Sequence, residues 1–109
     1  MNKIPYEERV AVYLEALSTF GPDMQLEIAL EELSELQKEV CKAIRGDVRP
    51  GSIAEEVADV AIMLEQIRCI FSIGEAADKI MDAKIVRLQH RIEKSKMSQG
   101  TVREALWWM

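Results

Sequence analysis

The chain has 109 residues, enough for one domain but too few for two independent hydrophobic cores. Its formal net charge of −5 argues against a nucleic-acid-binding surface, because backbone phosphates would be repelled. No apolar run approaches the roughly 20 residues of a membrane span, and two cysteines without a secretion signal favour reduced thiols and a cytoplasmic location.

The first two helices are predicted by apolar residues at helical spacing. Pro5 opens the first helix, which Gly21 and Pro22 end. Asp23 is the expected N-cap of a longer second helix that reaches about Arg45. An apolar stripe suited to antiparallel packing follows this second helix, and it consists of Leu26, Ala29, Leu30, Leu33, Leu36, Val40 and Ile44.

A third, central helix follows a short loop. Ser52 with Glu55 three residues later forms a capping box, which predicts a helix over 53–71. Its apolar residues cover most of the helical circumference, so we expect this helix to be buried. Glu56 and Asp59 lie among those apolar residues, and a buried carboxylate must be paired, bind a metal or be neutralised.

A fourth helix is predicted by a second capping box, Ser72 with Glu75, and it reaches about Lys96. Gly100 interrupts the chain before a last short turn. Trp107 and Trp108 at the end are too apolar to remain in water, so we expect them to cover a neighbouring surface.

The predicted fold is therefore all-α. We expect an up-and-down bundle of about four helices plus a short C-terminal turn, completed by oligomerisation. Residues 1–96 form a single domain in this prediction. Residues 97–109 form a C-terminal tail that packs on a neighbouring subunit.

Two pairs of acids are the main candidates for chemistry. Glu32 and Glu35 are neighbours on the second helix, as are Glu56 and Asp59 on the central one. Antiparallel packing across a short loop brings all four carboxylates together. Carboxylates so placed repel one another unless cations lie between them, and Mg²⁺, with Mn²⁺ as a substitute, is the matching ion.

The alternative for the second helix is an ordinary solvated face. In that interpretation Glu35 pairs with Lys38, and Glu39 pairs with Lys42, each three residues further along. The alternative is weaker for the central helix, because its two acids have apolar surroundings.

The fourth helix carries basic residues on one flank of its apolar stripe. Lys84 and Arg87 are suited to phosphate oxygens, although such long side chains also extend over the edges of bundles. For Arg91 the second interpretation is favoured. The single histidine, His90, does not follow a glutamate by three residues, which argues against a di-iron carboxylate bundle.

The segments Glu32-Leu-Ser-Glu35 and Glu56-Val-Ala-Asp59, about 20 residues apart, resemble the E-x-x-E…E-x-x-D signature of the MazG-like, all-α nucleoside triphosphate pyrophosphohydrolases. Gln25 and the basic run on the fourth helix are similar to short stand-alone members of that family. The resemblance covers roughly residues 20–93.

The resemblance implies Mg²⁺-dependent hydrolysis of a nucleoside triphosphate, in particular a dNTP, between its α and β phosphates, giving a monophosphate and pyrophosphate. It also implies a homodimer or a dimer of dimers. As an alternative role, one of Glu32 and Glu35 orients or deprotonates the attacking water instead of holding metal. The implied metal ligands are Glu32, Glu35, Glu56 and Asp59, and the implied substrate contacts are Gln25, Lys84 and Arg87.

Two other hypotheses belong to different classes. A catalytically silent helical regulator would keep the fold and bind a nucleotide or a protein without turnover. A structural oligomerisation bundle would show no Mg²⁺-dependent change in melting temperature.

Overall fold

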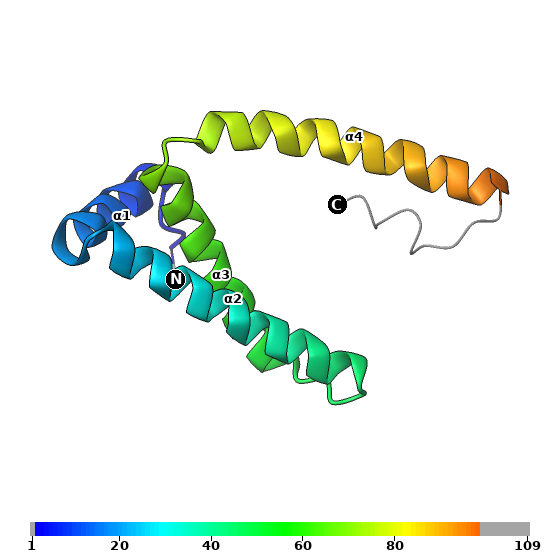
Figure 1. Ribbon diagram of the computed structural model, residues 1–109, viewed down its shortest axis with the longest axis horizontal. Coiled ribbons are helices and arrows are strands. Elements are labelled where there is room, and N and C mark those ends of the chain that lie inside the picture. The colour runs from blue at the N-terminus through cyan, green and yellow to red at the C-terminus, as the bar shows by residue number, and fades with distance from the viewer. Residues whose placement is uncertain (1, 99–109) are drawn as a thin grey trace. The chain divides into compact units, whose positions relative to one another are not determined.

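The computed structural model describes residues 2–98 of the chain (Figure 1). These residues form helices and connecting loops and contain no strand, which confirms the all-α prediction. The helices are α1 (Tyr6–Phe20), α2 (Pro22–Ile44), α3 (Pro50–Ile70) and α4 (Gly74–Ser98).

The chain divides into two compact units, Met1–Ser72 and Ile73–Met109. The predicted single domain over 1–96 stays a prediction, as does the packing of the tail over 97–109 on another subunit. Trp107 and Trp108 lie outside the described residues.

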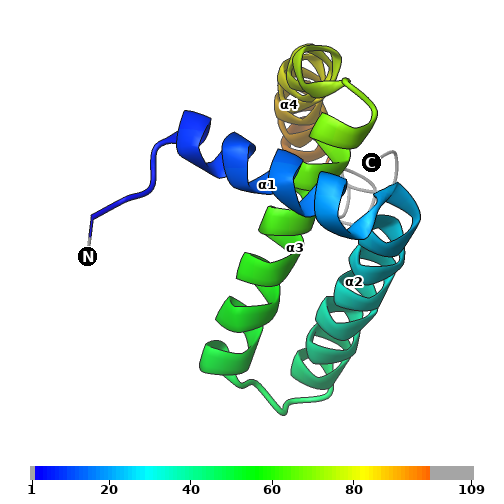
Figure 2. The ribbon, with the colours of Figure 1, turned by 90° about the vertical axis from the view of Figure 1, so that its left-hand side faces the viewer.

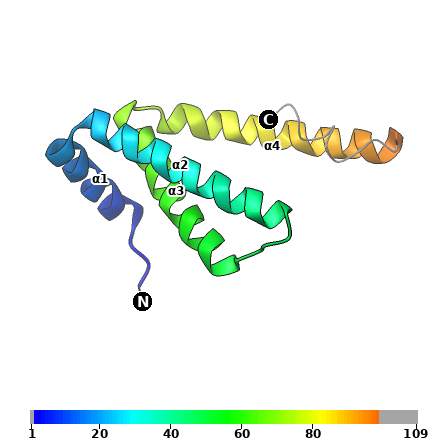
Figure 3. The ribbon, with the colours of Figure 1, turned by 60° about the horizontal axis from the view of Figure 1, so that its bottom comes forward.

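The first unit is built on α2 and α3, which lie side by side and run in opposite directions (Figure 2). The loop 45–49 joins them at one end (Figure 3). Near the other end, α1 packs on both helices. Gly21 is the only residue between α1 and α2, and its φ of 86° is a left-handed value that glycine adopts without strain.

The helices do not begin where their predicted capping residues indicate: α2 and α3 begin earlier, and α4 begins later. Pro22 and Pro50 occupy the first turns of α2 and α3, so Asp23 and Ser52 lie inside those helices and the predicted N-caps were wrong. Proline has no N–H to satisfy, and its fixed φ suits the first turn of a helix. Both α2 and α3 therefore start at the proline, closer to the N-terminus than predicted. Ser72 has a φ of 53° and precedes α4, which starts at Gly74.

The core of the first unit is small. Tyr13, Ala29, Val60 and Met63 are its buried apolar residues. The predicted burial of the central helix is met only in part within the single chain, because one face of α3 lies against α2 and other apolar side chains of α3 remain exposed. Those include Val57, Ile62 and Leu64.

The face of α2 that packs against α3 agrees with the predicted stripe at Ala29 but not along its whole length. Ala29 is only 2% exposed, whereas Leu30 is 69% exposed and Ile44 is 81% exposed. Ala29 shares its face with Gln25 and Glu32, at the helical spacings of four and three residues. The contact therefore runs along a narrower and more polar face than hydrophobicity alone indicates.

A cluster around Glu65 attaches α1 to α3. Arg9 Nε and the Tyr13 hydroxyl both donate to Glu65 Oε2, each at 3.1 Å. The Arg9 guanidinium also lies 5.4 Å from the centre of the Tyr6 ring. Partial burial, followed by the hydrogen bond to Glu65, raises the pKa of Tyr13. This Glu65 cluster supplements the small apolar contact beneath α1.

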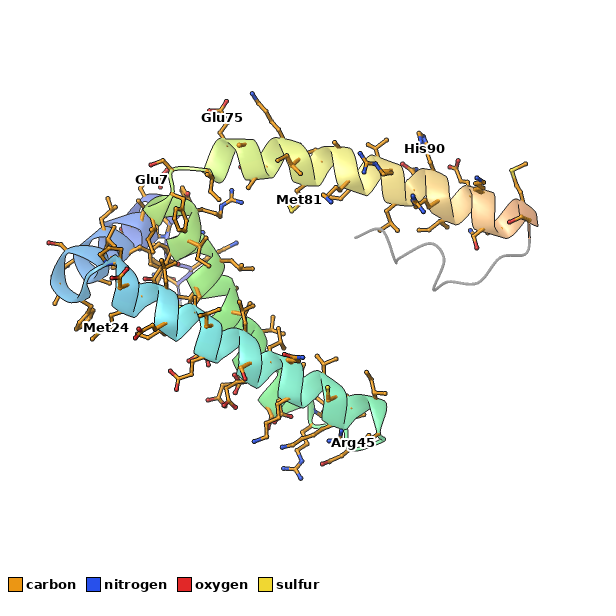
Figure 4. The ribbon with its side chains drawn as sticks, viewed as in Figure 1. Glu7, Met24, Arg45, Glu75, Met81 and His90 are labelled. Atoms are coloured by element: carbon orange, nitrogen blue, oxygen red, sulfur yellow. The ribbon has the colours of Figure 1, made fainter. Side chains whose placement is uncertain are left out.

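The second unit contains one described helix, α4. Met81 and His90 project from it in Figure 4. None of its described side chains is buried, and the exposed apolar ones include Ile80, Met81 and Ile85. Within residues 2–98, no helix combines the length and the hydrophobicity that a membrane span requires.

Candidate metal centre

Three carboxylates meet on the α2–α3 contact. Glu32 from α2 and Glu56 and Asp59 from α3 each offer one oxygen, and these oxygens lie within 4.8 Å of one another. All three side chains are half-buried. Glu35 is exposed and is not part of this group. The structure thus brings together three of the four acids that the sequence predicts as ligands; below they are called the carboxylate cluster.

The helices position the carboxylate cluster through their spacing. Glu56 and Asp59 are three residues apart and so project from one face of α3. Glu32 follows the buried Ala29 by three residues on α2. The small side chain of alanine permits a close approach of the two helices at that level, which is consistent with the position of the Glu32 carboxylate near the acids of α3.

The pKa of Glu32 is raised above its ordinary value. Partial loss of water is the largest cause, followed by the charge of Asp59, a hydrogen bond to Asp59 and the charge of Glu56. Each of these causes favours the neutral form of Glu32 over its charged form. A bound cation would remove this penalty on the charged form.

The pKa of Glu56 is also raised, and one of its carboxylate oxygens lacks a hydrogen-bond partner. Partial burial raises its pKa, followed by the charges of Asp59 and Glu35, with smaller effects from Glu55 and Glu39. Its Oε2 atom is buried without a hydrogen-bond partner. A buried carboxylate oxygen without a donor nearby is what a cation ligand looks like before the cation binds.

The donor set fits a hard divalent ion. Mg²⁺ binds carboxylate oxygens and keeps several of its waters, so three half-buried carboxylates are a sufficient protein contribution. Glu32, Glu56 and Asp59 are the residues that would hold such an ion.

The raised pKa values predict a pH dependence of the metal-free protein. Glu32 and Glu56 bind protons more tightly folded than unfolded, where the ordinary value is 4.5. The folded chain therefore carries the extra protons above that value, and its free energy of unfolding falls as the pH rises through the raised pKa values. Thermal unfolding in a chelator should show the melting temperature of the Glu56→Gln variant rising relative to that of the wild type as the pH increases from 4.5 through the raised pKa values. A difference in melting temperature that does not change with pH would contradict the raised pKa of Glu56.

The three predicted substrate contacts belong to different units of the chain. Gln25 lies on α2 seven residues before Glu32 and is 4% exposed. Lys84 and Arg87 belong to α4 in the second unit, where each makes a polar or electrostatic interaction of its own. Their proposed contacts with nucleotide and phosphate stay predictions.

Sequence reasoning missed several polar groups of the first unit. Glu39 was interpreted only as the partner of Lys42, and that ion pair exists, with Nζ and Oε1 3.5 Å apart. The other oxygen of Glu39, Oε2, is buried without a hydrogen-bond partner. Glu65 and Gln66 were not singled out at all. Their position within the most apolar helix of the chain was the available signal.

Comparison with protein-family models, with curated proteins and with solved structures gives no match to the chain. The resemblance to MazG-like enzymes therefore rests on the four acids and their spacing.

Proposed function

We propose that this protein is a Mg²⁺-dependent nucleoside triphosphate pyrophosphohydrolase of the MazG-like, all-α type. The observation that supports the proposal most strongly is the carboxylate cluster, in which acids from two helices converge within 4.8 Å. Its members belong to the two sequence segments that carry the resemblance.

The residues of this chain divide the work in the proposed reaction. Glu32, Glu56 and Asp59 hold the metal. When bound, Mg²⁺ neutralises the triphosphate and stabilises charge on the departing pyrophosphate. Glu35 is exposed and lies outside the carboxylate cluster, yet its charge acts on Glu56. It is therefore the acid that orients a water molecule and accepts its proton.

The proposed chemistry is a single displacement. The water oxygen forms a bond to the α-phosphorus, and the bond from that phosphorus to the α–β bridging oxygen breaks. Glu35 takes the proton of the water, and pyrophosphate leaves with the bridging oxygen. Lys84 and Arg87 are proposed to bind phosphate oxygens, a task for which their charge is suited.

The test is a panel of canonical and modified dNTPs with Mg²⁺, or with Mn²⁺ in its place, while pyrophosphate release is measured. We expect release that stops when the metal is chelated. Inertness toward the whole panel would count against the proposal. Nucleotide binding in calorimetry without turnover would instead support the catalytically silent regulator.

We further propose that the protein works as a homodimer or a dimer of dimers. Large apolar side chains on α2 and α3 are exposed to solvent in the single chain, among them Leu30 at 69% and Leu64 at 49% exposure. Covering them is favourable at about 25 cal/mol per Å². Light scattering should give a mass of at least two chains, which Leu30→Lys should lower relative to the control Lys38→Arg. A monomeric wild type would refute this part.

A further inference from the structure

Apart from the Tyr13 hydroxyl, two glutamines carry the only polar side-chain groups in the buried part of the described structure. Gln25 on α2 is 4% exposed and Gln66 on α3 is 8% exposed. A buried carboxamide is costly unless both of its polar ends are hydrogen-bonded. The hydrogen bonds of Gln66 therefore bear on its role.

Gln66 is poorly satisfied. Its Oε1 atom is buried and has no hydrogen-bond partner. Its Nε2 atom donates to Met63 Sδ at 3.5 Å. A thioether sulfur is only a weak acceptor. Nothing in the fold uses the carboxamide fully, so a hydrophobic side chain of the same size would serve the packing better.

The position of Gln66 connects it to the carboxylate cluster. Asp59, Met63 and Gln66 follow one another at spacings of four and three residues, so they share one face of α3. Seven residues of helix place the Gln66 backbone about 10 Å from that of Asp59. On α2, Gln25 precedes Glu32 by the same seven residues, on the face that packs against α3. Both glutamines thus lie to the same side of the acids.

Met63 separates the carboxamide from the acids. It is 5% exposed, and its unbranched side chain has three rotatable bonds. Moving it costs only a weak hydrogen bond and a local repacking. Its displacement would expose Oε1 and Nε2 of Gln66 on the face that leads to the carboxylate cluster.

We propose that Gln66 is a specificity-determining residue, which binds the hydrogen-bonding edge of the base while the carboxylate cluster holds the triphosphate end through the metal. This inference rests on the proposed function. A carboxamide presents an acceptor beside a donor, and base edges present the complementary pair, as in the bidentate contact of glutamine with adenine. The free Oε1 requires an N–H of the base.

The experiment compares wild type with Gln66→Met, which keeps the side-chain volume and removes the carboxamide. The control is Gln37→Met, an exposed glutamine on α2. Initial rates of pyrophosphate release are measured for dATP, dGTP, dCTP and TTP, and inorganic tripolyphosphate serves as an inhibitor without a base. Binding of the same nucleotides is measured with Ca²⁺ in place of Mg²⁺.

We expect wild type to prefer one base, and Gln66→Met to lower kcat/KM for that nucleotide by at least about 10-fold relative to the poorest one. Tripolyphosphate inhibition should not change, and the melting temperature should not fall. If Gln66→Met does not fold, Gln66→Asn is the second variant. It keeps the carboxamide on a shorter side chain and should also reduce the ratio of kcat/KM between the preferred and the poorest nucleotide.

Different results would overturn the role of Gln66 and the proposed function. A wild type without base preference, or an equal change for all nucleotides and tripolyphosphate, would overturn the role of Gln66 and leave the proposed function standing. Binding without pyrophosphate release would refute the proposed function, and the same comparison of dissociation constants would still decide the role of Gln66. A wild type that neither binds nor cleaves any nucleotide would refute both.

Discussion

Replacing Glu56 by Gln should abolish pyrophosphate release and, at the same time, make the metal-free protein more stable. The side chain keeps its shape but loses the charge that Asp59 and Glu35 oppose. Metal affinity should fall by more than about 100-fold, because direct ligands matter more than the groups that orient them. Calorimetric titration with Mg²⁺ or Mn²⁺ and thermal unfolding in a chelator measure the two effects.

The matched control is Glu27→Gln, which removes a charge from an exposed position on α2. It should leave activity, metal affinity and melting temperature near the wild-type values. Mg²⁺ should raise the melting temperature of the wild type and of this control, but not that of Glu56→Gln. A clear loss of metal-free stability in Glu56→Gln would show that Glu56 is structurally paired, which contradicts its role as a metal ligand.

Enlarging Ala29 should damage both the fold and the carboxylate cluster. Ala29 is 2% exposed on the face of α2 that packs against α3. Ala29→Leu inserts three carbon atoms into that contact, at a cost of about 1–3 kcal/mol. It should also move Glu32, one turn further along α2, away from Glu56 and Asp59. Chemical denaturation and Mg²⁺ titration should therefore both show a loss.

Ala11→Leu is the corresponding control, because Ala11 is exposed on α1. Its free energy of unfolding should stay within about 0.5 kcal/mol of the wild type. If Ala29→Leu weakened the fold but kept the wild-type affinity for Mg²⁺, the close approach of the two helices would not be what assembles the carboxylate cluster.

Within residues 2–98, the number and order of the helices followed from the sequence, because apolar spacing and the Pro and Gly residues between segments are local signals. The helix starts did not. At Ser52 the capping box competed with Pro50, and the proline prevailed because a first turn accepts proline without losing a hydrogen bond. The two signals overlap in sequence, and only their relative energies decide between them.

The carboxylate cluster was predictable in part for the same reason. Spacing alone placed Glu56 beside Asp59, and the short loop implied the antiparallel pairing that brings Glu32 to them. Which acid of α2 faces α3 depends on the rotation of that helix. The predicted apolar stripe contained both Ala29 and Leu30, and the structure buries Ala29 but leaves Leu30 exposed. Helix rotation is a tertiary property that local hydrophobicity does not determine.

The burial of Gln66 and the Glu65 cluster could not be predicted from spacing. The Glu65 cluster depends on where α1 lies, because Arg9 and Tyr13 of α1 contact Glu65 across a long stretch of sequence. An acid within an apolar helix shows that a partner is needed. It does not show which of the distant basic residues supplies it.

The single residue between α1 and α2 has a consequence for how this protein can change. Gly21 alone separates Phe20 from Pro22, so the rotation of α1 about its own axis is fixed relative to α2. One inserted residue would turn α1 by about 100° about its axis. That rotation would direct Arg9 and Tyr13 away from Glu65. Changes in chain length are therefore restricted at this junction, whereas the five-residue loop 45–49 leaves more room for them.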